Sequence, residues 1–234
     1  MYHIIFNNKN SYKDLDLRIV KRPNIPAPVK NINVVEVMGR NGDLYEDLGG
    51  YKDLNIDVEF NFKDTVNIKR TWRKIKSWLF NIEDNKLIFS DDIEFYYKVK
   101  NIALSELTIN KKILGKFTVT FTCEAYSYDV AGLEFIEVKN NSILYNYFDD
   151  SKPLLRIYSN TGGIGTITIN NNSFQVAVND CVHVDSNLEL TYQDLVRPAN
   201  LINGEYPTLK AGENKISFDS VISKIKIRPN WRTL

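Results

Sequence analysis

LNIDVEFNF, residues 54–62, decides the fold, because apolar and polar residues alternate along it without interruption. Successive side chains of a β-strand point to opposite faces, so this pattern predicts a strand with one buried face and one solvated face. GKFTVTFTCEAYSYD, residues 115–129, carries the same alternation, with three threonines on its polar face. Both stretches predict a mainly β N-terminal domain. Cys123 falls on the apolar face, where we expect a buried free thiol.

Three weaker strands are expected over residues 32–37, 94–99 and 102–109. A single helix, expected over about residues 65–81, interrupts the strands. Asp64-Thr65 is a suitable N-cap pair, and Ile68, Trp72, Ile75 and Leu79 recur at the spacing of one helix face. That stripe is expected to pack onto the sheet.

Basic residues occupy the other faces of the predicted helix: Lys69, Arg70, Arg73, Lys74 and Lys76. Two interpretations stay open. The basic face is either a solvated outer surface or a contact surface for an acidic neighbour, such as another copy of the chain.

The pattern changes between residues 127 and 153, so we predict an N-terminal domain over residues 1–140 and a C-terminal domain over 141–234. The second domain reads as short alternating strands with no helix of ordinary length. Asn170-Asn171-Asn172 is typical of a hairpin turn, since Asn tolerates left-handed backbone conformations. Many short strands at close spacing predict a β-sandwich. The expected strands span 154–158, 165–169, 174–178, 182–184, 216–218 and 225–227.

Composition narrows the classes of partner. Thirty basic and 29 acidic residues give a net charge of +1, which argues against nucleic acid as the main partner. The N-terminus lacks a secretory pattern, and no apolar run is long enough to span a membrane. We therefore expect synthesis in the cytoplasm and no membrane partner.

A search for chemistry finds no catalytic, cofactor-binding or metal-ligating set, so the chain is not expected to be an enzyme. His183 and Cys181 share a predicted strand face, but no further Cys or His completes a metal site. The glycines of residues 161–165 precede a strand and not a helix, so they do not form a phosphate loop. The doublets Asp91-Asp92 and Asp149-Asp150 read as solvated turns.

Aromatic residues leave an alternative open. Tyr96, Tyr97, Tyr126, Tyr128, Tyr145 and Tyr147 could stack on sugar rings. Aromatic side chains also fill cores and protein interfaces, which is the interpretation we prefer.

Four segments then resemble the distal tail proteins of long-tailed phages (siphophages), in the same order along the chain. These are VEVMGRNGDL (residues 35–44) before the strand at 54–62, the strand at 115–129, the hairpin region at 153–174 and the closing residues 207–234. The resemblance implies an N-terminal split-barrel-like β domain bearing one α-helix and a C-terminal galectin-like β-sandwich. Here the C-terminal region is compact, without the inserted carbohydrate-binding module that some members of the family carry.

The family likeness also implies a function. It implies a structural protein of the virion tail tip, in which six copies form a ring and phage DNA passes through it. The implied partners are the tail tube protein, the tape-measure protein, the tail-associated or fibre protein and a receptor-binding protein. A carbohydrate-binding module for host-wall sugars is the alternative, and a wall hydrolase with a carboxylate pair is the weaker one.

Two sets of residues are the expected interface candidates. The turn Gly39-Arg40-Asn41-Gly42 lies between two predicted strands and should contribute to a ring or channel contact. Arg70, Arg73 and Lys74 of the helix should contact a neighbouring protein in preference to DNA, since DNA passing through a tail needs a surface that does not grip it.

Overall fold

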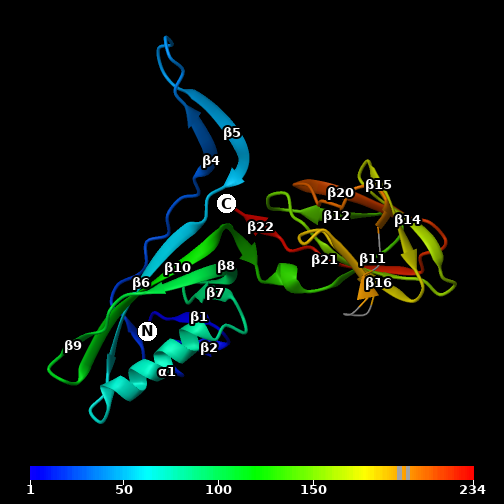
Figure 1. The fold of residues 1–234 in the computed structure, drawn as a ribbon. Coiled ribbons are helices and arrows are strands. Elements are labelled where there is room, and N and C mark those ends of the chain that lie inside the picture. Colours follow the sequence, from blue (N-terminus) through cyan, green and yellow to red (C-terminus); the bar gives the residue numbers. More distant parts are fainter. Residues whose placement is uncertain (194–196, 199–200) are drawn as a thin grey trace. The chain divides into compact units, whose positions relative to one another are not determined.

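The computed structural model describes residues 1–193, 197–198 and 201–234, and it divides into two compact units, Met1–Ser127 and Tyr128–Thr233 (Figure 1). The described residues are mainly β, with one α-helix, as the sequence predicts. The division falls at residue 127 and not near residue 140. The reason is pairing: the strand at Ile136–Val138 pairs with Lys224–Arg228 and so joins a sheet of the second unit.

A curled sheet forms the body of the N-terminal unit, in the order β2-β1-β7-β8-β10-β6-β3, with β9 beside β10. Its strands are β1 (Ile4–Phe6), β2 (Lys9–Asn10), β3 (Arg18–Ile19), β6 (Leu54–Lys63), β7 (Lys86–Phe89), β8 (Asp92–Leu104), β9 (Thr108–Asn110) and β10 (Leu114–Asp129). The two weak candidates at 94–99 and 102–109 were expected as separate strands. Most of their residues instead belong to the single continuous strand β8.

The two strongly alternating segments are partners. In β6 and β10, Phe60 pairs with Phe117 and Val58 with Val119 in an antiparallel register, so both apolar rows lie on one face. The rings of Phe60 and Phe117 stack with centroids 5.4 Å apart. Cys123, at the end of the row, is fully buried, as predicted.

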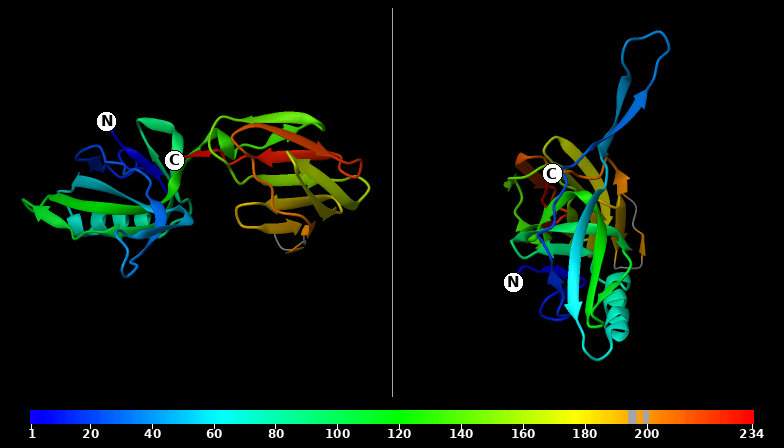
Figure 2. Two further views of the ribbon diagram at one scale, coloured as in Figure 1. Left: turned by 90° about the horizontal axis from the view of Figure 1, so that it is seen from above. Right: turned by 90° about the vertical axis from the view of Figure 1, so that its left-hand side faces the viewer.

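Helix α1 (Ile68–Phe80) covers this apolar face, and Figure 2 shows it alongside the sheet. Ile75, Trp78 and Leu79 are buried, and Ile68 and Trp72 pack partly against the same core. The Trp78 indole N–H donates to the carbonyl of Phe6 at 2.9 Å, which ties the helix to the N-terminal strand. The predicted helix face is therefore confirmed.

The start of the helix differs from the prediction. Asn67 is the N-cap, and its side chain accepts from the Arg70 N–H at 3.0 Å. Asp64 instead organises the turn before the helix by accepting from the backbone N–H groups of Val66 and Asn67. Hydrogen bonds from the Thr71 hydroxyl and these two N–H groups hold the pKa of Asp64 below its usual range.

A separate two-stranded ribbon, β4 (Lys30–Val35) with β5 (Leu44–Tyr51), also belongs to this unit. The expected strand over 32–37 corresponds to β4. Its partner β5 was not predicted, because the apolar residues of Leu44–Tyr51 do not alternate.

Two sheets form the C-terminal unit, as a sandwich should. One sheet has the order β11-β21-β13-β16-β17-β18, and the other has β12-β20-β14-β15-β19. Their strands are β11 (Ile136–Val138), β12 (Ser142–Asn146), β13 (Leu154–Tyr158), β14 (Gly163–Ile169), β15 (Asn172–Val178), β16 (Cys181–Asp185), β17 (Leu190–Gln193), β18 (Arg197–Pro198), β19 (Leu201–Asn203), β20 (Gly212–Phe218) and β21 (Lys224–Arg228). The short β22 (Arg232–Thr233) follows β21 in the chain and belongs to neither of these two sheets.

Apolar residues from both sheets bury one core in this unit, among them Leu155, Ile167, Phe174 and Ile225. Asn170 adopts a left-handed φ of 57° between β14 and β15, which confirms the predicted hairpin turn. A single-turn 3-10 helix at Ala131–Leu133 precedes the first strand.

Replacing Asn67 with Ala should lower the free energy of unfolding of the N-terminal unit by about 1 kcal/mol, because the Arg70 N–H loses its side-chain acceptor and keeps only the Asn67 carbonyl. Asn67→Ser keeps a capping oxygen and should lower it by clearly less. Urea unfolding followed by tryptophan fluorescence measures both variants. Equal losses in the two variants would contradict the capping role of Asn67.

Candidate functional site

The predicted turn Gly39–Gly42 lies at the end of the β4–β5 ribbon, which we call the arm (residues 30–51). Gly39 and Gly42 have φ angles of +82° and +83°, and the Arg40 N–H donates to the Val37 carbonyl at 3.2 Å. Left-handed backbone at these two positions requires glycine. All four turn residues are exposed.

Large apolar side chains are exposed along the arm on both of its faces. Val34 and Tyr45 are cross-strand partners and both are exposed, and Met38 in the turn is 99% exposed. Leu44 and Leu48 are exposed as well. A two-stranded ribbon is only marginally stable alone, and contiguous exposed apolar surface is typical of a protein contact. The arm is therefore the strongest candidate contact surface of the N-terminal unit.

The helix carries a second candidate surface. Lys69, Arg70, Arg73, Lys74 and Lys76 are all exposed, and α1 contains no acidic residue. In the part of the chain that the structure describes, none of the five forms an ion pair. Arg70, Arg73 and Lys74 therefore lie on one element and Gly39–Gly42 on another, so the predicted interface residues form two surfaces and not one.

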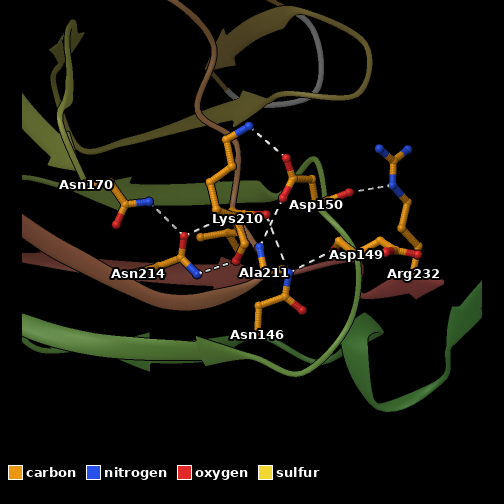
Figure 3. Close-up of polar contacts among 9 residues, drawn as sticks. Asn146, Asp149, Asp150, Asn170, Lys210, Ala211, Asn214 and Arg232 are labelled. Carbon is orange, nitrogen blue, oxygen red and sulfur yellow. Dashed lines mark hydrogen bonds and ion pairs between the residues drawn. The ribbon is translucent and has the colours of Figure 1, made fainter. Parts of the chain in front are cut away.

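The two carboxylate doublets have different surroundings: Asp91 lies 3.5 Å from Arg22, and Asp150 is held by contacts within the C-terminal unit. Asp150 accepts from Lys210 Nζ at 2.7 Å and from the Ala211 N–H at 3.0 Å, as Figure 3 shows. Burial raises the pKa of Asp150, but these hydrogen bonds and the charges of Lys210 and Arg232 outweigh burial and hold it below its usual range. A carboxylate kept ionised in this way is unsuited to act as a general acid.

The same loops hold a network of amides. Buried Asn214 donates to the Lys210 carbonyl at 2.8 Å and accepts from Asn170 Nδ2 at 2.9 Å (Figure 3). Buried Asn146 donates to the Asp149 carbonyl at 2.9 Å. The network joins the segment after β12 to the segment before β20, so we assign it a structural role.

The other candidate groups are also accounted for by packing. Burial raises the pKa of the Cys123 thiol to about 12, so it is not a nucleophile at neutral pH. The His183 ring stacks on Tyr192 with centroids 4.9 Å apart. No group of three or more His, Cys, Asp or Glu suited to a metal exists among the described residues. Within the same residues, the helix is not long and apolar enough to cross a membrane.

Of the six tyrosines proposed for sugar stacking, Tyr96 and Tyr128 are buried in the fold. Tyr145 and Tyr147 are exposed and lie together, with ring centroids 4.6 Å apart and planes tilted by 49°. Among the six tyrosines, these two are therefore the pair best placed to contact a sugar ring. They lie at the end of β12.

Comparison with known proteins connects these surfaces to a family. The family model of the phage tail protein RIFT-related domain matches residues 8–123, which covers almost all of the N-terminal unit. The chain belongs to the siphophage tail proteins. The predicted resemblance to distal tail proteins is thus confirmed.

A solved structure shows the same fold over the whole length. This tail protein is similar to the Dit protein (gp 19.1) of phage SPP1, described as a paradigm of the hub adsorption apparatus in phages that infect Gram-positive bacteria. The TM-score is 0.64 at 14% sequence identity, with all of both chains covered. No curated protein matches the chain. Family and fold are those of a structural component of the virion tail.

The sequence reasoning missed most of the arm of this tail protein. It identified the turn but treated Leu44–Tyr51 as a Tyr-rich connection. The usable signal was the cluster of apolar residues at 44, 45 and 48 followed by Gly49-Gly50, which marks an exposed strand that ends in a bend.

Replacing Asp150 with Asn should lower the melting temperature of the C-terminal unit at pH 7. A carboxyl group whose pKa is lowered by folding stabilises the fold above its unfolded pKa of about 4 and loses that effect as pH falls through the lower folded value. The difference between wild type and variant should therefore shrink on acidification to about pH 3. Thermal unfolding followed through Trp231 fluorescence measures it. Asp180→Asn, at an exposed residue, is the control, and a difference that is constant with pH would contradict the assignment.

Proposed function

We propose that the chain is a hub protein of the tail tip, which forms a ring of six copies between the tail tube and the tail-associated or fibre protein. Phage DNA would pass through the ring, and the protein would act through its assembly and not as an enzyme. The tape-measure protein and a receptor-binding protein complete the proposed set of partners. Family membership and the shared fold support a tail role, and the arm supports the ring.

The exposed arm is the observation that carries the ring proposal. Its apolar side chains, such as Val34, Tyr45 and Leu48, are exposed on a ribbon with little packing of its own. Burial of apolar surface stabilises by roughly 25 cal/mol per Å², so a neighbouring copy that covers the arm would both order and stabilise it. A closed cyclic ring requires such a contact between two different surfaces of the same chain.

The edges of the main sheet favour a contact made by the arm over a contact made by pairing of strands between two copies of the chain. The strongly alternating strands β6 and β10 pair with each other, and the edge strands β2 and β3 are each two residues long. Short edges offer few unpaired backbone groups to another chain.

The basic face of α1 suits a contact with an acidic ring that stacks on this one. Five exposed cations on a 13-residue helix would be drawn to a protein surface of opposite charge. DNA is the other candidate for this face. Protein is preferred, because a conduit for DNA must not hold the phosphates.

A carbohydrate-binding module is the second candidate function. The paired rings of Tyr145 and Tyr147, the latter 83% exposed, could stack on a sugar. A monomeric chain that retains purified wall polysaccharide, and loses it on Tyr147→Ala, would favour this candidate over the ring.

Size-exclusion chromatography with light scattering tests the ring. Six copies of the 27.1 kDa chain should give about 163 kDa. Val34→Asp with Tyr45→Asp should shift the mass toward one copy, and Arg40→Ala with Asn41→Ala should weaken the hexamer.

Ile143→Asp with Leu188→Asp is the matched control, since both residues are exposed and apolar but lie outside the arm. Control and wild type should run alike. A wild-type chain that stays at 27.1 kDa at every concentration tested contradicts the self-assembled ring.

Charge reversal of the helix separates its two candidate contacts. Arg70→Glu, Arg73→Glu and Lys74→Glu together should leave the fold intact and reduce assembly of complete tails, counted by electron microscopy. The control Lys21→Glu, Lys139→Glu and Lys215→Glu makes the same change in net charge at exposed positions elsewhere. Normal tails with altered DNA ejection would assign the helix to the channel.

A further inference from the structure

The outer face of one C-terminal sheet carries a cluster of cations and aromatic rings. In β13, β16 and β21 every second side chain is buried, so the intervening residues point outward. Arg156 pairs with His183 on one side and with Lys226 on the other, which places the three on one row across the strands. Arg228 lies two residues along β21 from Lys226. The motif KIKIR, residues 224–228, produces this row of cations.

Two arginines of this face share a single ring. The guanidinium carbon of Arg156 lies 4.0 Å from the centroid of Phe135, and that of Arg228 lies 4.5 Å from the same centroid. The Nε–H groups of both arginines are buried and donate to no acceptor among the described residues. The ring therefore holds both side chains in place, and hydrogen bonds within the fold do not.

Two acidic residues lie near this row, and one of them, Glu137, is the cross-strand neighbour of Lys226. Glu137 pairs with Lys224 at 3.4 Å, and Asp185 accepts from the backbone N–H groups of the turn that follows it. Arg156, Arg228 and Lys226 have no acidic side chain within 4.0 Å in the part of the chain that the structure describes. Like charges held side by side destabilise a sheet unless an anion joins them.

We propose that Arg156, Arg228 and Phe135 form a binding site for phosphate groups carried along an extended anionic polymer. Two guanidinium forks from different strands offer more donors than one planar carboxylate can accept, whereas a phosphate group presents several oxygens to both. Alternate residues of a strand are about 6.7 Å apart, so Lys226 continues the row beside Arg228 at a spacing suited to successive charges of a chain. This site does not depend on the proposed ring.

Isothermal titration calorimetry of the 234-residue chain tests the site. Sodium polyphosphate is the probe, and orthophosphate, which carries a single phosphate group, is the comparison ligand. Polyphosphate should bind more tightly per phosphate than orthophosphate, and binding should weaken between about 50 mM and about 500 mM NaCl. Arg156→Gln with Arg228→Gln should weaken polyphosphate binding by about tenfold or more, since each lost charge-assisted hydrogen bond is worth at least that factor.

Two further pairs of substitutions make the result specific. Arg156→Lys with Arg228→Lys keeps the charge but removes the forks, so its loss should lie between those of wild type and the Gln pair. This pair also keeps the test valid if the Gln pair lowers the melting temperature. Lys139→Gln with Lys215→Gln removes two exposed cations elsewhere in the unit and should change binding less than twofold.

Four outcomes would overturn the site. They are no binding of polyphosphate, equal binding of orthophosphate per phosphate, an equal loss in the Lys139/Lys215 control, and tighter binding of poly-L-glutamate through the same arginines. The last outcome would assign the face to an acidic protein partner.

Discussion

The antiparallel pairing of β6 with β10 is the constraint on which the N-terminal unit depends. Its register sets Phe60 against Phe117 and Val58 against Val119, so the apolar residues of the two strands form one continuous face. If one of the two strands slipped by one residue, its apolar row would turn toward solvent while that of its partner stayed buried. The helix, the N-terminal strand and the curl of the sheet all follow from covering that face, because Trp72 contacts Phe117 and Phe6 contacts both Trp78 and Phe121.

The sequence predicts this part of the fold well, because alternation and helical spacing report burial directly. The strands around Phe60 and Phe121, the helix stripe and the hairpin at Asn170 are visible without any tertiary information. The C-terminal sandwich is predicted for the same reason. The unit to which residues 127–146 belong is harder to predict from the sequence. The strands at 136–138 and 142–146 are placed only by pairing with β21 and β20, which lie about 80 residues later in the chain.

Contact surfaces are less visible in the sequence than cores. Arg40 and Asn41 could be located from the turn glycines, and the helix cations from their spacing. The second strand of the arm gives a weaker signal, because β5 has no buried face to impose alternation and only its apolar cluster before Gly49-Gly50 marks it. The Phe135 cluster was also missed, since its arginines lie 72 residues apart in the chain and meet only through the pairing of β13 with β21. A regular K-I-K-I-R run shows which residues point outward but not what lies beside them.

The base of the arm has a bulge with consequences for when the arm becomes ordered. Gly49 and Gly50 both adopt left-handed φ angles, and the register shifts at this point between Lys30 and Ile32. Such a bulge interrupts the ladder and bends the strand. Opening of the ribbon can therefore stop at the glycines without disturbing β6 and its core, which makes the arm a separate cooperative unit of low local stability. The core of the free chain can therefore be fully folded while the arm still exchanges amide hydrogens rapidly.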